Sequence, residues 1–348
     1  MVSVSVIMAT ARSSYPIVGL SNVYVLEPTL HSLEKQSFRD FELIIVDALY
    51  PAKKEWIEKR KWSFPIKYVP PHPNHRFWLD RGLWNVAGML NTALLYAEGE
   101  LIVRIDDASE IPDVNYLQKF WDAYQQGYFA LAMHTRYRRG RQAYFNEEYC
   151  REGYDIAREP ASRRDILLNF FKEGDPIRDT RWPTVERHGR MIAPPEWFYG
   201  FSSFSLEAAL KINGFSELCD PVKGQEDQNF GVRLSMAGYK NMLLLDKDLW
   251  VIEHEHLPCV VKSPEPFKCT YGLIQYEQVK GLFRANSWKL SLEDCEWIRR
   301  NICPKCLNYS RCLNETLKGQ FYVDNELFRL WLSKQPLFDL RMERLEVA

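Results

Sequence analysis

Strand-length apolar runs alternate with helical patterns through the first 110 residues, and this alternation constrains the fold more than any other feature. The runs are rich in β-branched residues, and the helical segments repeat leucine or alanine along one helix face. The expected strands are residues 2–8, 41–47, 66–69 and 100–105, and the expected helices are residues 28–36 and 89–97. Such an alternation predicts an α/β fold with a mainly parallel sheet flanked by helices.

Polar residues follow three of these strands. Thr10 lies just beyond the first strand, Asp47 ends the second, and Asp106 and Asp107 follow the fourth. In open α/β sheets, ligands bind beyond the carboxyl ends of the strands. We therefore expect these side chains to line one crevice.

The segment ELIVRIDDASE places two adjacent carboxylates, Asp106 and Asp107, at the end of a buried strand. Like charges this close raise each other's pKa or recruit a counter-ion, so a metal site is one interpretation. The other interpretation is a hydrated strand-to-turn corner in which Asp106 caps the next segment. The pair alone leaves both open.

Composition excludes several classes of protein. The 348 residues are 46% hydrophobic and 26% charged, and the formal net charge of −1 argues against a uniformly basic nucleic-acid binder. An arginine-rich run over residues 136–141 could still face a polyanion, or it could be a solvated loop. The length suggests one large domain with an appendage, or two domains.

Cysteine usage and hydropathy indicate a compartment. No segment reaches the ~20 apolar residues of a membrane span, and the amino terminus lacks the pattern of a signal peptide. Eight cysteines are too few for a disulfide scaffold in a chain of this length. We therefore expect a cytoplasmic protein.

Two later segments carry candidate site residues. The aromatic run at residues 197–201 includes Trp197 and Tyr199, whose rings could stack on a sugar or a base, or could pack in the core. One helix is expected from about residue 206 and another from about Glu226, which precedes Asp227. The helix dipole favours acidic residues at this position, so simple capping also explains Glu226 and Asp227.

Taken in order, these segments resemble family 2 GT-A glycosyltransferases. The matching blocks are VSVIMAT, FELIIVD, MLNTALLYAEGE, IVRIDDAS, GFSSFSLEAALKINGFSE and GQEDQNFGVRLSMAGY. The later blocks are similar to the carboxy-terminal part of galactosyl- and N-acetylgalactosaminyl-transferase domains. The resemblance covers roughly residues 2–258 and implies a GT-A domain over residues 1–258. Beyond Pro258 the composition changes to helical, Trp- and Leu-rich segments, so a helical extension is expected over residues 259–348.

The resemblance implies an enzyme that uses a nucleotide sugar and a divalent cation. In this family pattern Asp107 is the direct metal ligand, and Asp106 lies near the ribose or the metal. His254 or His256, after a strand near the end of the block, fits the position of a further metal ligand; a surface histidine pair is the alternative. Oxygen ligands suit Mn²⁺ or Mg²⁺, and an imidazole favours Mn²⁺.

The same resemblance assigns the chemistry of transfer. It implies that Asp227 is the base that deprotonates an acceptor hydroxyl, with Glu226 supporting it. One base and one in-line attack predict inversion at the anomeric carbon. Trp197 and Tyr199 are then expected to contact the acceptor, a glycan or another molecule with a hydroxyl group, nucleic acid included.

Donor recognition departs from the family pattern at one position. Many members have a second aspartate after the one that matches Asp47, and this chain has Ala48 there. A UDP-sugar donor is therefore expected from the family resemblance alone. The residues expected to contact the donor are Thr10, Arg12, Asp47, Arg76, Arg81 and Asp106, although Arg76 and Arg81 could equally be ordinary surface charges.

Four of the eight cysteines lie within an 18-residue segment of the carboxy-terminal tail. Cys295, Cys303, Cys306 and Cys312 fall close together, and the Cys303-Pro-Lys-Cys306 knuckle could present two thiolates to one ion. A structural Zn²⁺ site is one interpretation, an iron–sulfur cluster is a weaker one, and four unlinked buried thiols are the third.

Two other functions compete with glycosyl transfer. A sugar nucleotidyltransferase on a similar sheet needs a glycine-rich phosphate loop after the first strand, and the segment ATARSSYP contains no glycine. A nucleic-acid-binding module could use the cysteine knuckle and the arginines of residues 136–141, alone or as part of a glycosyltransferase.

Overall fold

The computed structural model describes residues 2–11, 26–82, 85–107, 109–137, 177–178, 181–222, 225–254, 270–284, 286–305, 333 and 337–347. The strands within these ranges are β1 (Val4–Thr10), β2 (Phe41–Asp47), β3 (Ile66–Val69), β4 (Leu101–Arg104), β5 (Ser109–Glu110), β6 (Phe129–Tyr137), β7 (Ile177–Arg178), β8 (Arg190–Ile192), β9 (Ser202–Ser205) and β10 (Leu243–His254). The α-helices are α1 (Glu27–Glu34), α2 (Lys54–Glu58), α3 (Val86–Tyr96), α4 (Tyr116–Gln125), α8 (Trp182–His188), α9 (Leu206–Lys211), α10 (Glu226–Met236), α11 (Thr270–Lys280), α12 (Leu292–Asn301) and α15 (Leu340–Val347). Short 3₁₀ helices are η1 (Pro73–His75), η2 (Leu79–Arg81), η4 (Pro195–Trp197), η5 (Glu217–Val222) and η7 (Cys303–Lys305).

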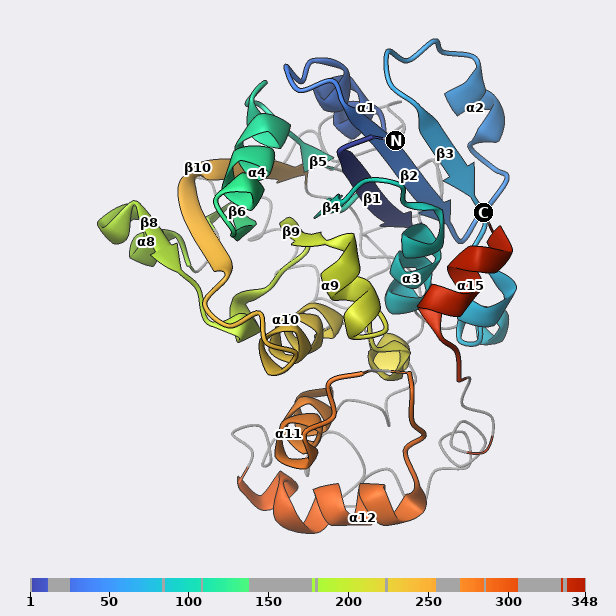
Figure 1. Cartoon of the computed structure of the whole chain (residues 1–348). Helices are drawn as coiled ribbons and strands as arrows, with labels where there is room; N and C mark the ends of the chain where they lie inside the picture. Colours follow the sequence, from blue (N-terminus) through green and yellow to red (C-terminus); the bar gives the residue numbers. More distant parts are fainter. Residues whose placement is uncertain are drawn as a thin grey trace, which may run out of the picture.

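The described strands form one ten-stranded sheet with the order β3-β2-β1-β4-β9-β6-β10-β5, to which β7 and β8 are added at β6 and β10. The strands β3, β2, β1 and β4 are parallel, and β6 is parallel to β10. Antiparallel β9 joins these two groups, because it pairs with both β4 and β6. The expected α/β sheet flanked by helices is confirmed, and its second half is mixed (Figure 1).

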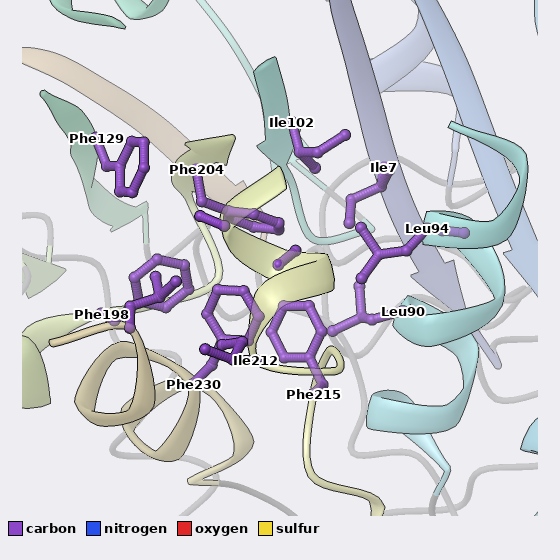
Figure 2. Close-up of a cluster of buried hydrophobic side chains, with 14 of the residues drawn as sticks. Ile7, Leu90, Leu94, Ile102, Phe129, Phe198, Phe204, Ile212, Phe215 and Phe230 are labelled. Carbon is purple, nitrogen blue, oxygen red and sulfur yellow. The ribbon is translucent and has the colours of Figure 1, made fainter. Parts of the chain in front are cut away.

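Helices cover both faces of the sheet. Alternate side chains of each strand point to opposite faces, so neighbouring residues of one strand pack against different helices. Val6 of β1 belongs to a hydrophobic cluster with α1 and α4, whereas its neighbour Ile7 belongs to a second cluster with α3, α9 and α10. Figure 2 shows the second cluster, in which Phe215 stacks on Phe230 with ring centroids 4.1 Å apart. This packing fixes α10 against the sheet.

The chain returns to the sheet at its carboxyl end. Helix α15 packs beside α3 (Figure 1), and Arg344 donates to the carbonyl oxygens of Leu95 at 3.3 Å and Ala97 at 2.7 Å. These carbonyls lie at the end of α3, where a helix leaves acceptors without internal partners. Helices α11 and α12 pack together in a third cluster with Trp78. The domain boundary expected after residue 258 lies outside the described residues.

None of the helices in the described ranges has the length and apolar composition needed to cross a membrane.

Candidate functional site

The first pair of expected site residues meets at the carboxyl end of β1. Thr10 is the last residue of β1, and its Oγ1 donates a hydrogen bond of 2.8 Å to Oδ2 of Asp107, which follows β4. Strands β1 and β4 are parallel neighbours, so their carboxyl ends lie together. Both side chains are buried. The hydrogen bond fixes the orientation of the Asp107 carboxylate.

Asp47 ends β2 beside Thr10, but its carboxylate is held by residues of its own neighbourhood. Lys53 Nζ lies 2.7 Å from Oδ2, and the Tyr68 hydroxyl donates to the same oxygen at 2.6 Å. The backbone N–H of Leu49 donates to Oδ1 at 2.8 Å. Burial, and then the hydrogen bond to Asp47, raise the pKa of Tyr68. A donor-binding role for Asp47 stays a prediction, because these bonds give it a structural role already.

An arginine that the sequence did not single out joins the two acidic segments. Arg104 is the last residue of β4, and its side chain is only 4% exposed. Its NH2 lies 3.4 Å from Oδ1 of Asp106 and 3.3 Å from Oε1 of Glu226, and its NH1 forms an ion pair with Asp227. The guanidinium therefore bridges the end of β4 to the amino terminus of α10, and it compensates carboxylates with 8% and 16% exposure at Glu226 and Asp227.

The position of these carboxylates on α10 is set by close packing. Helix α10 begins at Glu226, directly after Gln225 in a left-handed conformation with φ of 69°. One turn further, a Cβ on Gly231 would lie 2.2 Å from the carbonyl oxygen of Pro195, so only glycine permits this approach of α10 to η4. Phe230 of the same helix is fully buried. The first turn of α10 is thereby directed at Arg104.

Asp106 lies near other carboxylates. Its side chain is 38% exposed, but partial desolvation of the carboxylate raises its pKa; Arg104 opposes this effect, and the carboxylates of Glu253 and Asp107 add to it. Glu253 belongs to β10, so a third element contributes negative charge here. A Cβ on Gly200 would lie 2.2 Å from Oδ2 of Asp106, so the absence of a side chain at residue 200 makes room for this carboxylate. Carboxylate oxygens suit a hard divalent cation, but among the described residues Asp106, Asp107 and Glu253 do not form a set of three closely spaced ligand atoms.

Several expected metal and donor residues fall outside the described part of the chain. His254 is the last residue of β10, next to Glu253, and only its backbone is described. His256 and Arg12 lie outside the described residues. The structure thus places the backbone of one expected histidine ligand on the strand that carries Glu253.

The two aromatic residues expected to contact the acceptor, Trp197 and Tyr199, are packed against other side chains. Tyr199 stacks on His134 with ring centroids 5.2 Å apart, and the guanidinium carbon of Arg181 lies 4.9 Å from the centre of its ring. Arg181 also donates to the carbonyl oxygen of Trp197 at 2.7 Å. Both aromatic side chains are partly buried against the two core clusters, while Phe198 is fully buried. Core packing thus accounts for part of this aromatic run.

The two arginines expected to contact a diphosphate have local partners. Arg76 Nε lies 2.7 Å from Oδ1 of Asp80, and both side chains are more than 40% exposed. Arg81 donates to the carbonyl oxygen of Phe77 at 2.6 Å and stacks over its ring at 3.7 Å. A role in donor binding stays a prediction for both.

The structure describes two of the four cysteines that were expected to bind zinc. Cys295 and Cys303 are buried in the hydrophobic cluster around α11 and α12, and burial raises the pKa of the Cys295 thiol to about 12. Cys306 and Cys312 lie outside the described residues. The shared zinc site is therefore untested.

Comparison with solved structures identifies proteins of similar fold. The chain is similar to residues 1–349 of TarS from S. aureus, with a TM-score of 0.51 and 14% identity over 91% of this chain and 75% of that one. The chain has a GT-A fold. It is also similar to GalNAc-T7, solved with UDP, GalNAc and Mn²⁺, with a TM-score of 0.50 and 14% identity over 99% of this chain and 57% of that one. No protein-family model and no curated protein matches the sequence.

Proposed function

We propose that this chain is a metal-dependent glycosyltransferase that moves a sugar from a nucleotide-sugar donor to an acceptor hydroxyl with inversion. The observation that carries the proposal is the Arg104 bridge, which brings Asp106 together with Glu226 and Asp227 at the carboxyl end of β4 in a GT-A fold. A carboxylate pair on one side and a carboxylate on the facing helix are what a cation-assisted transfer with a separate base needs. The GT-A enzyme GalNAc-T7 has been solved with UDP, GalNAc and Mn²⁺.

The cation side of the site is assigned to the end of β4 and the end of β10. Asp107, with Asp106 and a histidine at position 254 or 256, would hold Mn²⁺ or Mg²⁺. When bound, the cation neutralises the charge that develops on the leaving diphosphate. Thr10 keeps the Asp107 carboxylate in one orientation through its hydrogen bond. Donor contacts, with UDP as the expected nucleotide, are assigned to Thr10, Arg12, Asp47, Arg76, Arg81 and Asp106.

The base is assigned to Asp227. Its side chain is 16% exposed, so an acceptor can reach it, whereas Glu226 beside it is 8% exposed. Arg104 contacts both carboxylates and keeps them in place. Removal of a proton from the acceptor by a positioned carboxylate contributes about 10²- to 10⁴-fold to the rate. Trp197 and Tyr199 are the proposed acceptor contacts.

The test compares two isosteric variants, Asp227→Asn and Glu226→Gln. The reaction is hydrolysis of the best substrate in a panel of nucleotide sugars with Mn²⁺, because water can take the place of the acceptor. Asp227→Asn is expected to lower turnover by at least ~10²-fold while UDP affinity in the presence of Mn²⁺ is unchanged. Glu226→Gln is expected to have the smaller effect. Inversion is checked from the anomeric configuration of the sugar first released.

Two results would change the assignment. If Asp227→Asn retains turnover and Glu226→Gln loses it, the two roles must be exchanged. If both variants remain active, a single displacement with a carboxylate base on α10 is wrong.

A further inference from the structure

A second cluster of ligand-type side chains lies where the loop after β3 meets the last helix, α15. His72 caps η1, His75 is its last residue, and Glu343 belongs to α15. One nitrogen of each histidine and one oxygen of the glutamate all lie within 4.8 Å of one another. His75 and Glu343 are buried, and His72 is partly buried. None of these residues belongs to the carboxylate site at Arg104.

The central histidine is oriented by an outer carboxylate. Nδ1 of His75 lies 2.6 Å from Oε1 of Glu217, and Nε2 lies 3.0 Å from Oε2 of Glu343. Glu217 is itself held, because Asn91 Nδ2 donates to the same Oε1 at 2.9 Å. A histidine whose second nitrogen is held by a fixed carboxylate is the usual arrangement around a protein-bound metal ion.

His72 lies beside the ion pair that His75 forms with Glu217 and Glu343. Without a metal, His75 is an imidazolium between two glutamates; burial alone would lower its pKa, but Glu217 and Glu343 raise it to about 9. That ion pair does not require His72, whose ring centroid lies 5.8 Å from that of His75. His72 caps η1, because its Nδ1 accepts from the backbone N–H of Asn74 at 3.4 Å, and it also adds a second imidazole to the cluster. Two imidazoles with one carboxylate form a ligand set well suited to Zn²⁺.

We propose that His72, His75 and Glu343 bind one structural divalent transition-metal ion, Zn²⁺ being the best fit, which pins α15 to the loop after β3. Tetrahedral zinc with bonds of about 2.0–2.2 Å separates its ligand atoms by about 3.4 Å, close to the 3.0 Å between Nε2 of His75 and Oε2 of Glu343. A water molecule would supply the fourth ligand of such an ion.

The ion would complete the attachment of the carboxyl end. Glu343 and its neighbour Arg344 anchor α15 in two directions, to the loop after β3 and to the end of α3. His75 and Glu343 are separated by 268 residues in sequence, so the metal would link two distant parts of the chain. Removal of the ion should therefore expose residues 340–347 to hydrogen exchange while β1 and β2 remain protected.

The experiment uses the full chain, stripped with a chelator and titrated with Zn²⁺. The decisive variant is His72→Ala, because it leaves His75 between its two glutamates and should fold. The matched control is His31→Ala, which removes a half-exposed histidine from α1. Wild type and His31→Ala are expected to gain thermal stability with Zn²⁺ and to bind one more equivalent than His72→Ala. The loss of affinity should exceed the roughly 10- to 100-fold caused by removing an outer-shell partner.

Other metal sites do not confuse this comparison. An ion at the tail cysteines or at Asp107 would be shared by wild type and His72→Ala, so only the difference is counted. Co²⁺ bound at the proposed site should show no thiolate charge-transfer absorption. A second variant, Glu343→Gln, is expected to lose the same equivalent. Equal Zn²⁺ stoichiometry and affinity in wild type and His72→Ala would overturn the proposal and leave the cluster as an ion pair.

Discussion

Replacing Arg104 by glutamine should destabilise the protein far more than replacing an exposed arginine. Arg104 is 4% exposed and faces Glu226 and Asp227, which are 8% and 16% exposed. Removing one partner of a buried ion pair leaves an uncompensated charge and costs about 3–5 kcal/mol in the free energy of unfolding. Asp106, the third partner, has a side chain that is 38% exposed, so water stabilises much of its charge when Arg104 is removed.

The assay is urea unfolding of matched variants at neutral pH. Arg76→Gln is the control, because Arg76 and Asp80 are 41% and 48% exposed, and such a pair contributes about 0–1 kcal/mol. Arg104→Lys keeps a positive charge and should recover part of the loss. A loss no larger than that of Arg76→Gln would refute a buried bridge between β4 and α10.

Two further predictions concern a close contact and a buried acid. Gly200→Ala places a Cβ 2.2 Å from Oδ2 of Asp106, so the carboxylate must move, and Mn²⁺ affinity should fall roughly tenfold or more; an affinity within about twofold of wild type would contradict this. Burial raises the pKa of Glu277 from 4.5 to about 7, so the folded chain keeps a proton that the unfolded chain releases. The bound proton stabilises the folded chain by up to about 3 kcal/mol below pH 4.5, and this contribution is lost as the pH rises through 7. The free energy of unfolding of wild type should therefore fall with pH over this range, and in Glu277→Gln this fall should be absent. The same fall in both proteins would rule the explanation out.

Local patterns in the sequence predicted the sheet well. The short strand expected at residues 66–69 is β3, and the helix expected near Glu226 is α10, which begins at that residue. Helix α3 begins at Val86, three residues before the expected start, because its first turn is held by contacts from elsewhere: Asp220 accepts from the backbone N–H groups of Ala87 at 2.6 Å and Gly88 at 2.9 Å. Such contacts carry no local signal.

Helix α4 was not expected, although its sequence carries a helical pattern. Helix α4 buries Tyr116, Leu117 and Phe120 on one face, and their spacing is typical of a helix.

Arg104 could not have been found in this way. Its ion pair with Glu226 spans 122 residues, so the two come together only when β4 and α10 pack in the folded chain. Likewise, Asp47 was a good candidate as a strand-end carboxylate, yet its charge is met by Lys53, a residue whose side chain is itself buried. A sequence pattern identifies which acids lie at the edge of the sheet, but it does not say which cations reach them.

The most direct test of the account is metal-dependent donor turnover through Asp107. Wild type and Asp107→Ala would be compared with a panel of nucleotide sugars, each with Mn²⁺ and with chelator, and release of the free nucleotide would be measured. At least one donor is expected to be turned over by wild type with Mn²⁺, and chelator and Asp107→Ala are each expected to abolish the reaction. Undiminished turnover in chelator, or by Asp107→Ala with Mn²⁺, would contradict this expectation.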